Sequence, residues 1–206
     1  MQIEPGIEPG EAAVDDRDAI IEAAFSCLSE PHTGVVPIAA VLARAGLSTR
    51  AFYRHFESKD ALFLAMQQSA GRSLARRLDR IADGNDGVPA DQLAHWIGVA
   101  FEVIHNARSH GRATVLDSDE VRSAKGYLTA QEQWRIDRER SLAALLRRGR
   151  DDGSFPLARP ERDAAAIRAV VSHELSRLRA DGDWECARAA VVDFALRAVG
   201  AHTRDR

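Results

Sequence analysis

Residues 38–66, which read IAAVLARAGLSTRAFYRHFESKDALFLAM, decide the fold of this chain. In the first eight of these residues the apolar side chains recur at helical spacing, which predicts a short helix over residues 38–45. Gly46 follows, and a helix C-terminus favours glycine because glycine accepts the left-handed conformation. Ser48 or Thr49 can then cap a second helix through its side-chain oxygen. The pattern predicts two short helices joined by a tight turn.

The second of these helices covers residues 49–55, two turns that are not stable alone because helix nucleation costs more than so few hydrogen bonds return. Phe52 and Phe56, at i and i+4, supply an apolar face that can pack it onto a core. Arg50 and Arg54 lie on the opposite face. A helix, a turn and a short helix with a polar outer face are typical of the helix-turn-helix, whose second helix enters the major groove of DNA.

Charge is concentrated around this motif. Residues 37–59 carry four positive side chains and one negative one, a net charge of +3, whereas the whole chain of 206 residues has a net charge of −3. Nucleic-acid binding would therefore use a local patch. The candidate DNA-contacting residues are Arg44, Ser48, Thr49, Arg50, Tyr53, Arg54, His55 and Lys59. Arg50 and Arg54 are the candidate readers of guanine, which a guanidinium group binds bidentately.

The run ARAGLSTRAFYRHFESKDAL resembles the signature of the tetracycline-repressor (TetR) family. The matching residues are Ala45, Gly46, Ser48, Tyr53, Phe56, Ser58, Lys59, Asp60 and Leu62. The resemblance implies an all-α fold, with an N-terminal three-helix helix-turn-helix domain and a larger C-terminal helical domain for effector binding and dimerisation. It also implies that Tyr53, His55 and Lys59 bind phosphates.

The rest of the chain divides into a tail and two domains. Residues 1–15 contain a tandem IEPG repeat and acidic residues, which predicts a disordered tail because Pro, Gly and Glu bury little surface. Residues 16–60 are expected to form the DNA-binding domain and residues 61–206 the effector-binding and dimerisation domain. In the latter, apolar periodicity predicts helices over residues 91–108, 111–119, 121–150, about 160–180 and 184–201. Arginines of the third of these, Arg138 among them, are expected on its outer face.

Apolar periodicity also predicts a first helix over residues 16–30 and a fourth helix from Ser58 to Ile81. Counting all the predicted helices in chain order, the resemblance implies an inducer pocket between the fourth, fifth, seventh and eighth. The candidate ligand-binding residues are Met66, Trp96, Phe101, His105, Tyr127, Trp134 and His173. Aromatic side chains at helical spacing more often pack in a core, and a histidine in an apolar setting is more often hydrogen-bonded there. Both interpretations stay open at this point.

The last predicted helix is apolar on more than one face, which favours a four-helix bundle made by the last two helices of two subunits. A terminal helix buried within one subunit is the alternative, and the resemblance favours the homodimer. The candidate interface residues are Ile167, Val171, Leu175, Leu178, Val191, Phe194, Ala195 and Ala198.

Other classes of protein find little support. Walker, G-x-G-x-x-G, H-E-x-x-H and G-x-S-x-G motifs are absent and no histidines pair at i, i+4, so we expect no enzyme, cofactor or metal site. Cys27 and Cys186 are expected to be small buried hydrophobes. No apolar run approaches the roughly 20 residues of a membrane span, and the N-terminus lacks the plan of a signal peptide, which predicts a cytoplasmic protein.

These features together predict a dimeric regulator that binds a specific double-stranded DNA operator. A repressor released by a small-molecule effector is the expected form, because occupancy of DNA alone can block a polymerase. The alternatives are a helical protein-interaction adaptor without DNA binding, and a regulator with no small-molecule inducer.

Overall fold

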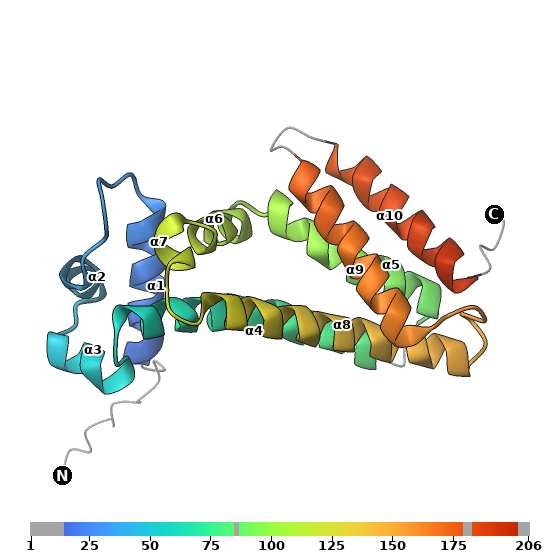
Figure 1. Cartoon of the computed structure of the whole chain (residues 1–206), viewed down its shortest axis with the longest axis horizontal. Helices are drawn as coiled ribbons and strands as arrows, with labels where there is room; N and C mark the ends of the chain where they lie inside the picture. Colours follow the sequence, from blue (N-terminus) through green and yellow to red (C-terminus); the bar gives the residue numbers. More distant parts are fainter. Residues whose placement is uncertain (1–14, 85–86, 179–182, 202–206) are drawn as a thin grey trace, which may run out of the picture. The chain divides into compact units, whose positions relative to one another are not determined.

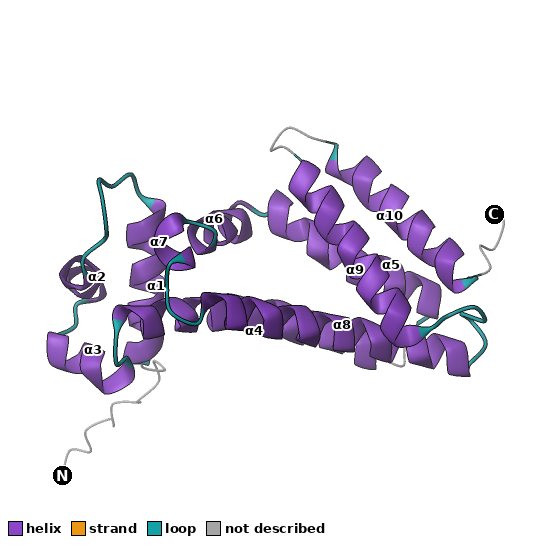
Figure 2. Ribbon diagram, viewed as in Figure 1, coloured by secondary structure: helices purple, strands orange, loops and turns teal. Residues whose placement is uncertain are grey.

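The structure is a computed structural model, and it describes residues 15–84, 87–178 and 183–201. In these residues every regular element is an α-helix and no strand occurs (Figure 2). The predicted all-α fold is confirmed. The chain divides into two compact units, Met1–Leu62 and Phe63–Arg206. Of the predicted disordered tail over residues 1–15, residues 1–14 lie outside the described part of the chain.

The first unit contains α1 (Asp16–Ser29), α2 (Ile38–Ala45) and α3 (Thr49–His55) (Figure 1). Gly46 ends α2 in the left-handed conformation, with φ of 67°. Ser48 begins α3, because its hydroxyl oxygen accepts a hydrogen bond from the Ala51 backbone N–H at 3.2 Å. The two short helices and the turn therefore lie where the sequence predicts them.

The core of this unit holds α3 in place. Phe52 is completely buried and Phe56 is 3% exposed. They pack in a core that includes Ile20 and Ile21 of α1, which lies against both α2 and α3. Burying one phenylalanine stabilises a fold by about 1.5–3 kcal/mol, so this pair can hold a helix of two turns that would not form alone.

Helix α4 (Lys59–Asp83) begins directly after Ser58, whose hydroxyl accepts a hydrogen bond from the Ala61 N–H at 3.1 Å. The later helices are α5 (Pro89–His105), α6 (Ala107–Leu116), α7 (Asp119–Arg122), α8 (Tyr127–Asp151), α9 (Pro160–Arg177) and α10 (Trp184–Val199). In the second unit α9 packs against α5, α8 and α10 (Figure 1). None of the described helices combines the length and the hydropathy needed to cross a membrane.

Three of the predicted helices have different bounds in the structure. The helix predicted over residues 111–119 is α6, which begins at Ala107 and ends at Leu116. The helix predicted over residues 91–108 ends at His105, because Asn106 caps α6 by accepting a hydrogen bond from the Ser109 N–H at 3.1 Å. The helix predicted over residues 121–150 is divided into α7 and α8. Gly126 has a φ of 94°, a conformation that a continuous helix does not contain.

The core of the second unit is built on large apolar side chains. Trp96, Phe101 and Phe155 have almost no exposed surface. Phe155 lies so close to Gly149 of α8 that a Cβ atom at residue 149 would be 2.1 Å from its ring. Glycine at this position therefore lets the segment after α8 fold back onto the helix.

Candidate nucleic-acid interface

Helix α3 has one buried and one exposed face. Ala51, Phe52 and Phe56 are buried, whereas the side chains Thr49, Arg50, Tyr53 and Arg54 are exposed. Tyr53 has 62% of its surface exposed, although its ring meets the Phe52 ring edge-on with centroids 5.3 Å apart. A large aromatic side chain held against the core and left in contact with solvent is suited to binding another macromolecule.

The buried face fixes the orientation of the exposed one. The rings of Phe52 and Phe56 are 5.5 Å apart, and the Arg17 guanidinium of α1 lies over the Phe56 ring at 5.5 Å. Because both aromatic anchors are held from within the unit, α3 cannot rotate without breaking these contacts. The side chains opposite them therefore project away from the core.

The exposed cations of α3 are only weakly neutralised. Within the described residues Arg50 has no ion pair. The Arg54 guanidinium is 3.8 Å from the Asp16 carboxylate, and its side chain is 64% exposed. The His55 ring, which unlike Arg50 and Arg54 is partly buried, lies 3.9 Å from the same carboxylate. An exposed pair of the length of Arg54 and Asp16 is worth little, so the arginines of α3 stay available to a phosphate or a base.

Arg44, another predicted DNA-contacting residue, is engaged within the unit. Its guanidinium donates two hydrogen bonds to the Glu30 carboxylate, at 2.5 and 2.7 Å. The hydrogen bond from Arg44 lowers the pKa of Glu30. This paired geometry satisfies both ionised groups, so Arg44 does not present a free cation.

Two further predicted contacts have local structural roles. Ser48 caps α3, and the Lys59 ammonium donates a hydrogen bond to the Val36 carbonyl oxygen in the segment before α2. Lys59 is partly buried. No local sequence pattern indicates the Lys59 contact, because Lys59 and Val36 are separated by 23 positions.

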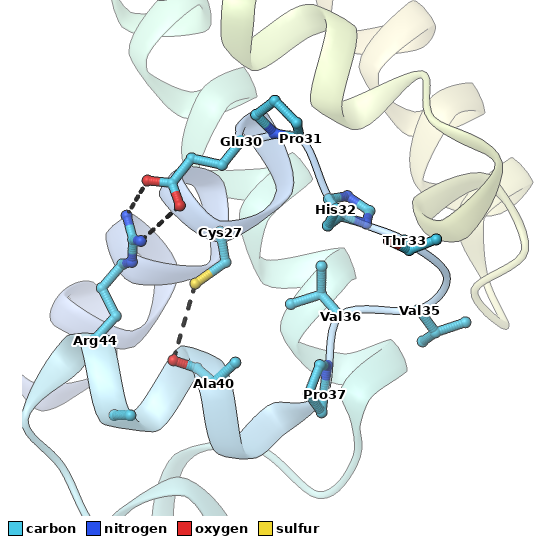
Figure 3. A pocket seen from close by; sticks show the side chains of 11 residues that line it. Cys27, Glu30, Pro31, His32, Thr33, Val35, Val36, Pro37, Ala40 and Arg44 are labelled. Carbon is cyan, nitrogen blue, oxygen red and sulfur yellow. Dashed lines mark hydrogen bonds and ion pairs between the residues drawn. The ribbon is translucent and has the colours of Figure 1, made fainter.

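A shallow pocket of about 510 Å³ lies between the end of α1, the segment after it and α2 (Figure 3). Glu30 and Arg44 form one wall, and the Cys27 thiol faces the Ala40 carbonyl oxygen at 3.9 Å. Cys27 is partly buried and Cys186 is exposed, so the expectation that both are buried is wrong for Cys186. Sequence reasoning did not find this pocket, since its walls come from two helices and a loop.

The predicted ligand-binding residues occupy several environments in the second unit. Met66, Trp96, Phe101 and Tyr127 are buried, Trp134 is partly buried and His173 is exposed. The side chain of His105 is outside the described part of the structure. Trp134 lies against Gly71 of α4, where a Cβ atom would be 2.4 Å from the indole. Trp134 is therefore in close contact with α4, whereas Trp96 and Phe101 are core residues.

The predicted dimer-interface residues also differ in their exposure. Ile167, Val171, Val191 and Ala195 are buried within the second unit, and Leu175 and Leu178 are partly buried. Phe194 is 39% exposed and Ala198 is exposed, both on α10. The four buried side chains are covered by their own chain, which leaves Phe194 and Ala198 as the outward apolar residues of the set.

The comparisons with known proteins agree with this geometry. Residues 20–66 match the model of the family described as bacterial regulatory proteins, tetR family. The resemblance predicted from the sequence is thereby confirmed. No curated protein gives a significant match.

Solved structures resemble most of the chain. NemR of Escherichia coli in its reduced form has 16% identity and a TM-score of 0.74, over 92% of this chain and 100% of that one. SmeT of Stenotrophomonas maltophilia, in complex with triclosan, has 24% identity and a TM-score of 0.72, over 89% of this chain and 90% of that one. FadR of Bacillus subtilis, in complex with stearoyl-CoA, has 14% identity and a TM-score of 0.69, over 88% and 98%. At these identities the likeness shows the fold.

Proposed function

We propose that this chain, whose residues 20–66 match the N-terminal domain of the tetR family of bacterial regulatory proteins, is a dimeric, sequence-specific DNA-binding transcriptional regulator. The observation that carries the proposal is the outer face of α3. Arg50, Tyr53 and Arg54 are exposed there, opposite two buried phenylalanines. A helix of this kind in a helix-turn-helix places its polar side chains in the major groove.

The residues of α3 take different roles in this proposal. Arg50 and Arg54 read guanine, and a good bidentate contact gives about 1–3 kcal/mol of discrimination against the wrong base. Tyr53 and His55 bind phosphates, and Thr49 reaches a base or a phosphate. Phosphate contacts set affinity and its dependence on salt, whereas base contacts set specificity.

Dimerisation through α9 and α10 completes the DNA-binding form. The exposed apolar side chains Phe194 and Ala198 on α10 support this part of the proposal. Two subunits related by a two-fold axis would place their α3 helices in successive major grooves, with half-sites roughly 34–36 Å apart or a multiple of one turn. Light scattering during size-exclusion chromatography should give the mass of a dimer at micromolar concentration.

We further propose that the regulator is a repressor released by a small-molecule effector. Solved structures with the same fold include complexes with triclosan and with stearoyl-CoA, each of which is a ligand of that other protein. Release requires that the effector bind the DNA-free conformation more tightly than the DNA-bound one.

Selection from random DNA followed by an electrophoretic mobility shift tests the DNA-binding proposal. We expect one enriched, two-fold symmetric sequence that wild-type protein binds. Arg50→Ala should lose discrimination at one base pair of each half-site, and the matched control is Arg140→Ala on α8, another exposed arginine. A selection that enriches no sequence, or an Arg50→Ala variant with unchanged specificity, would contradict the proposal.

A further inference from the structure

Arg138 faces inward on α8, contrary to the outward position expected from the sequence. Arg138, Leu142, Leu145 and Gly149 follow one another at helical spacing and so lie on one stripe. Leu142 and Leu145 have no exposed surface, and Gly149 is buried under Phe155. Arg138 itself is partly buried. A guanidinium group thus begins a stripe that otherwise forms the core of the second unit.

The neighbouring arginines have carboxylate partners, but Arg138 has none within the described residues. Glu139 accepts hydrogen bonds from Arg135 of α8 and from Arg168 of α9, each at 2.7 Å. The Arg138 guanidinium donates through Nε to the Trp134 carbonyl oxygen at 3.3 Å. Burial lowers the pKa of Arg138, and the cation of Arg168 lowers it further, while Glu139 opposes this only in part.

A cation in such a position is unfavourable without a counter-ion. Arginine is rarely buried unless it is paired, because removing its charge from water costs more than one neutral hydrogen bond returns. The local cluster has three arginines against Glu132 and Glu139, so it keeps one positive charge in excess. An anion at Arg138 would balance that charge.

A second polar group without a partner lies on α4. Gln67 is 1% exposed, and neither its amide nitrogen nor its amide oxygen has a hydrogen-bond partner. A buried amide left in this state destabilises the fold, so most buried polar groups in folded proteins are paired. Gln67 therefore also has unused capacity to bind a polar atom.

Helices α4 and α8 approach each other closely at two points, where Leu64 contacts Gly126 and Gly71 contacts Trp134. We call the line between these two contacts the seam between α4 and α8. The order of these contacts shows that α4 and α8 run in the same direction. Gln67 precedes Gly71 by one helical turn and Arg138 follows Trp134 by one turn. At a rise of 1.5 Å per residue, the two groups are separated by about 12 Å along the seam.

We propose that the seam between α4 and α8 binds an organic carboxylate with an apolar body, whose carboxylate pairs with Arg138 and whose far end lies towards Gln67. The inference rests on the proposed function, since it names the chemical class of the effector. A carboxylate suits the planar fork of a guanidinium group, with which it forms two parallel charge-assisted hydrogen bonds. The apolar body would lie beside Trp134.

Thermal unfolding with matched probes tests this proposal. The probes are sodium octanoate and sodium 3-phenylpropanoate at millimolar concentration, and their primary amides are the neutral controls, with ionic strength held constant by sodium chloride. We expect both carboxylates to raise the Tm of the wild-type protein and the amides to have little effect. Titration followed by NMR of the tryptophan indole N–H groups should show the largest shift at Trp134.

Variants at Arg138 separate recognition from a general effect of the anion. Arg138→Met should weaken carboxylate binding by about tenfold or more, the effect of losing a hydrogen bond to a charged group, and should not lower the Tm of the protein without probe. Arg138→Lys should retain weak binding because it keeps the charge. Arg135→Met, on the same helix, is the matched control and should bind the carboxylates like wild type.

Several results would overturn the proposal. They are no rise in Tm with either carboxylate, an equal rise with the amides, or unchanged carboxylate binding by Arg138→Met. A lower Tm of Arg138→Met without probe would show that the guanidinium stabilises the fold, and would overturn it too. Specific DNA binding by wild-type protein without probe is measured separately, so its failure contradicts the proposed function whatever the carboxylates do.

Discussion

The arginines of α3 and those of α8 and α9 are the same residue type in two different electrostatic settings. On α3, Arg50 has no ion pair within the described residues, and the one pair of Arg54, with the exposed carboxylate of Asp16, is long at 3.8 Å. On α8 and α9, Arg135 and Arg168 share Glu139 at 2.7 Å. The first set can bind an external anion, whereas the second joins two helices. Pairing with carboxylates, more than the number of arginines, distinguishes a binding surface from a structural one.

Helix length explains part of this difference. The seven residues of α3 include no Asp or Glu, so no carboxylate on the same helix can neutralise its arginines. The 25 residues of α8 place Glu132 and Glu139 at i−3 and i+4 from Arg135, the spacings at which helical side chains meet. A short helix without acidic residues is therefore a simple way to keep cations free.

The largest expected effect comes from removing the anchor of the α3 surface. Phe52→Ala should destabilise the first unit by about 3–5 kcal/mol, because the phenylalanine is fully buried and its removal leaves a cavity. DNA binding should be lost with it. Amide hydrogen exchange measures the effect unit by unit, and α1–α3 should lose protection while α9 keeps it.

The matched variant is Phe194→Ala, which truncates the same residue type where it is 39% exposed. It should leave exchange in the first unit unchanged. Equal protection of α3 in Phe52→Ala and wild-type protein would show that the packing of this phenylalanine does not hold the helix.

The second effect concerns the free cation itself. Arg50→Ala should cost about 1–3 kcal/mol of discrimination at one base pair while leaving the stability of the first unit unchanged, because the side chain is exposed and unpaired in the described structure. Competition binding with operator variants, each changed at one base pair, gives the discrimination directly. A loss of affinity shared equally by every variant would assign Arg50 to a phosphate instead.

How far the sequence predicts these settings depends on the distance between the interacting residues. Phe52 and Phe56, four residues apart, were recognisable as an anchor, and Gly46 and Ser48 set the limits of the turn. The pair of Arg44 and Glu30 joins residues 14 positions apart, and no local pattern indicates it. The prediction that Arg138 lies on the outer face is wrong, because it follows the charge of the side chain, whereas the spacing of Arg138 from Leu142 and Leu145 indicates the inner face.

The third effect tests the arginines that join helices. Glu139→Gln should destabilise the second unit by about 1–2 kcal/mol, because it weakens charge-assisted hydrogen bonds from Arg135 and Arg168 at a carboxylate that is one-fifth exposed. Urea unfolding measures the loss. Discrimination between operator variants should not change, and a change there would mean that the two sets of arginines are not independent.

The Glu139 carboxylate should also make the stability of the second unit depend on pH. Burial raises the pKa of Glu139, but the hydrogen bonds from Arg168 and Arg135 outweigh it, and the pKa lies below its ordinary value. Its contribution is therefore complete above about pH 4.3, the ordinary pKa of glutamate, and is lost as the pH falls through the lower pKa of the folded state. Between about pH 6 and pH 3 the free energy of unfolding should fall more steeply with decreasing pH in wild-type protein than in Glu139→Gln. Parallel curves would contradict the assignment.

The smallest expected effect would convert a paired arginine into a free one. Glu30→Gln removes the carboxylate that holds Arg44, so the first unit would gain one unneutralised cation beside those of α3. If that cation reaches a phosphate, the slope of log affinity against log salt should become steeper by about one unit, with little change in preference among sequences. The double variant Glu30→Gln/Arg44→Gln is the control and should return to the wild-type slope. An unchanged slope in Glu30→Gln would show that Arg44 lies out of reach of DNA, and would confine the binding surface to α3.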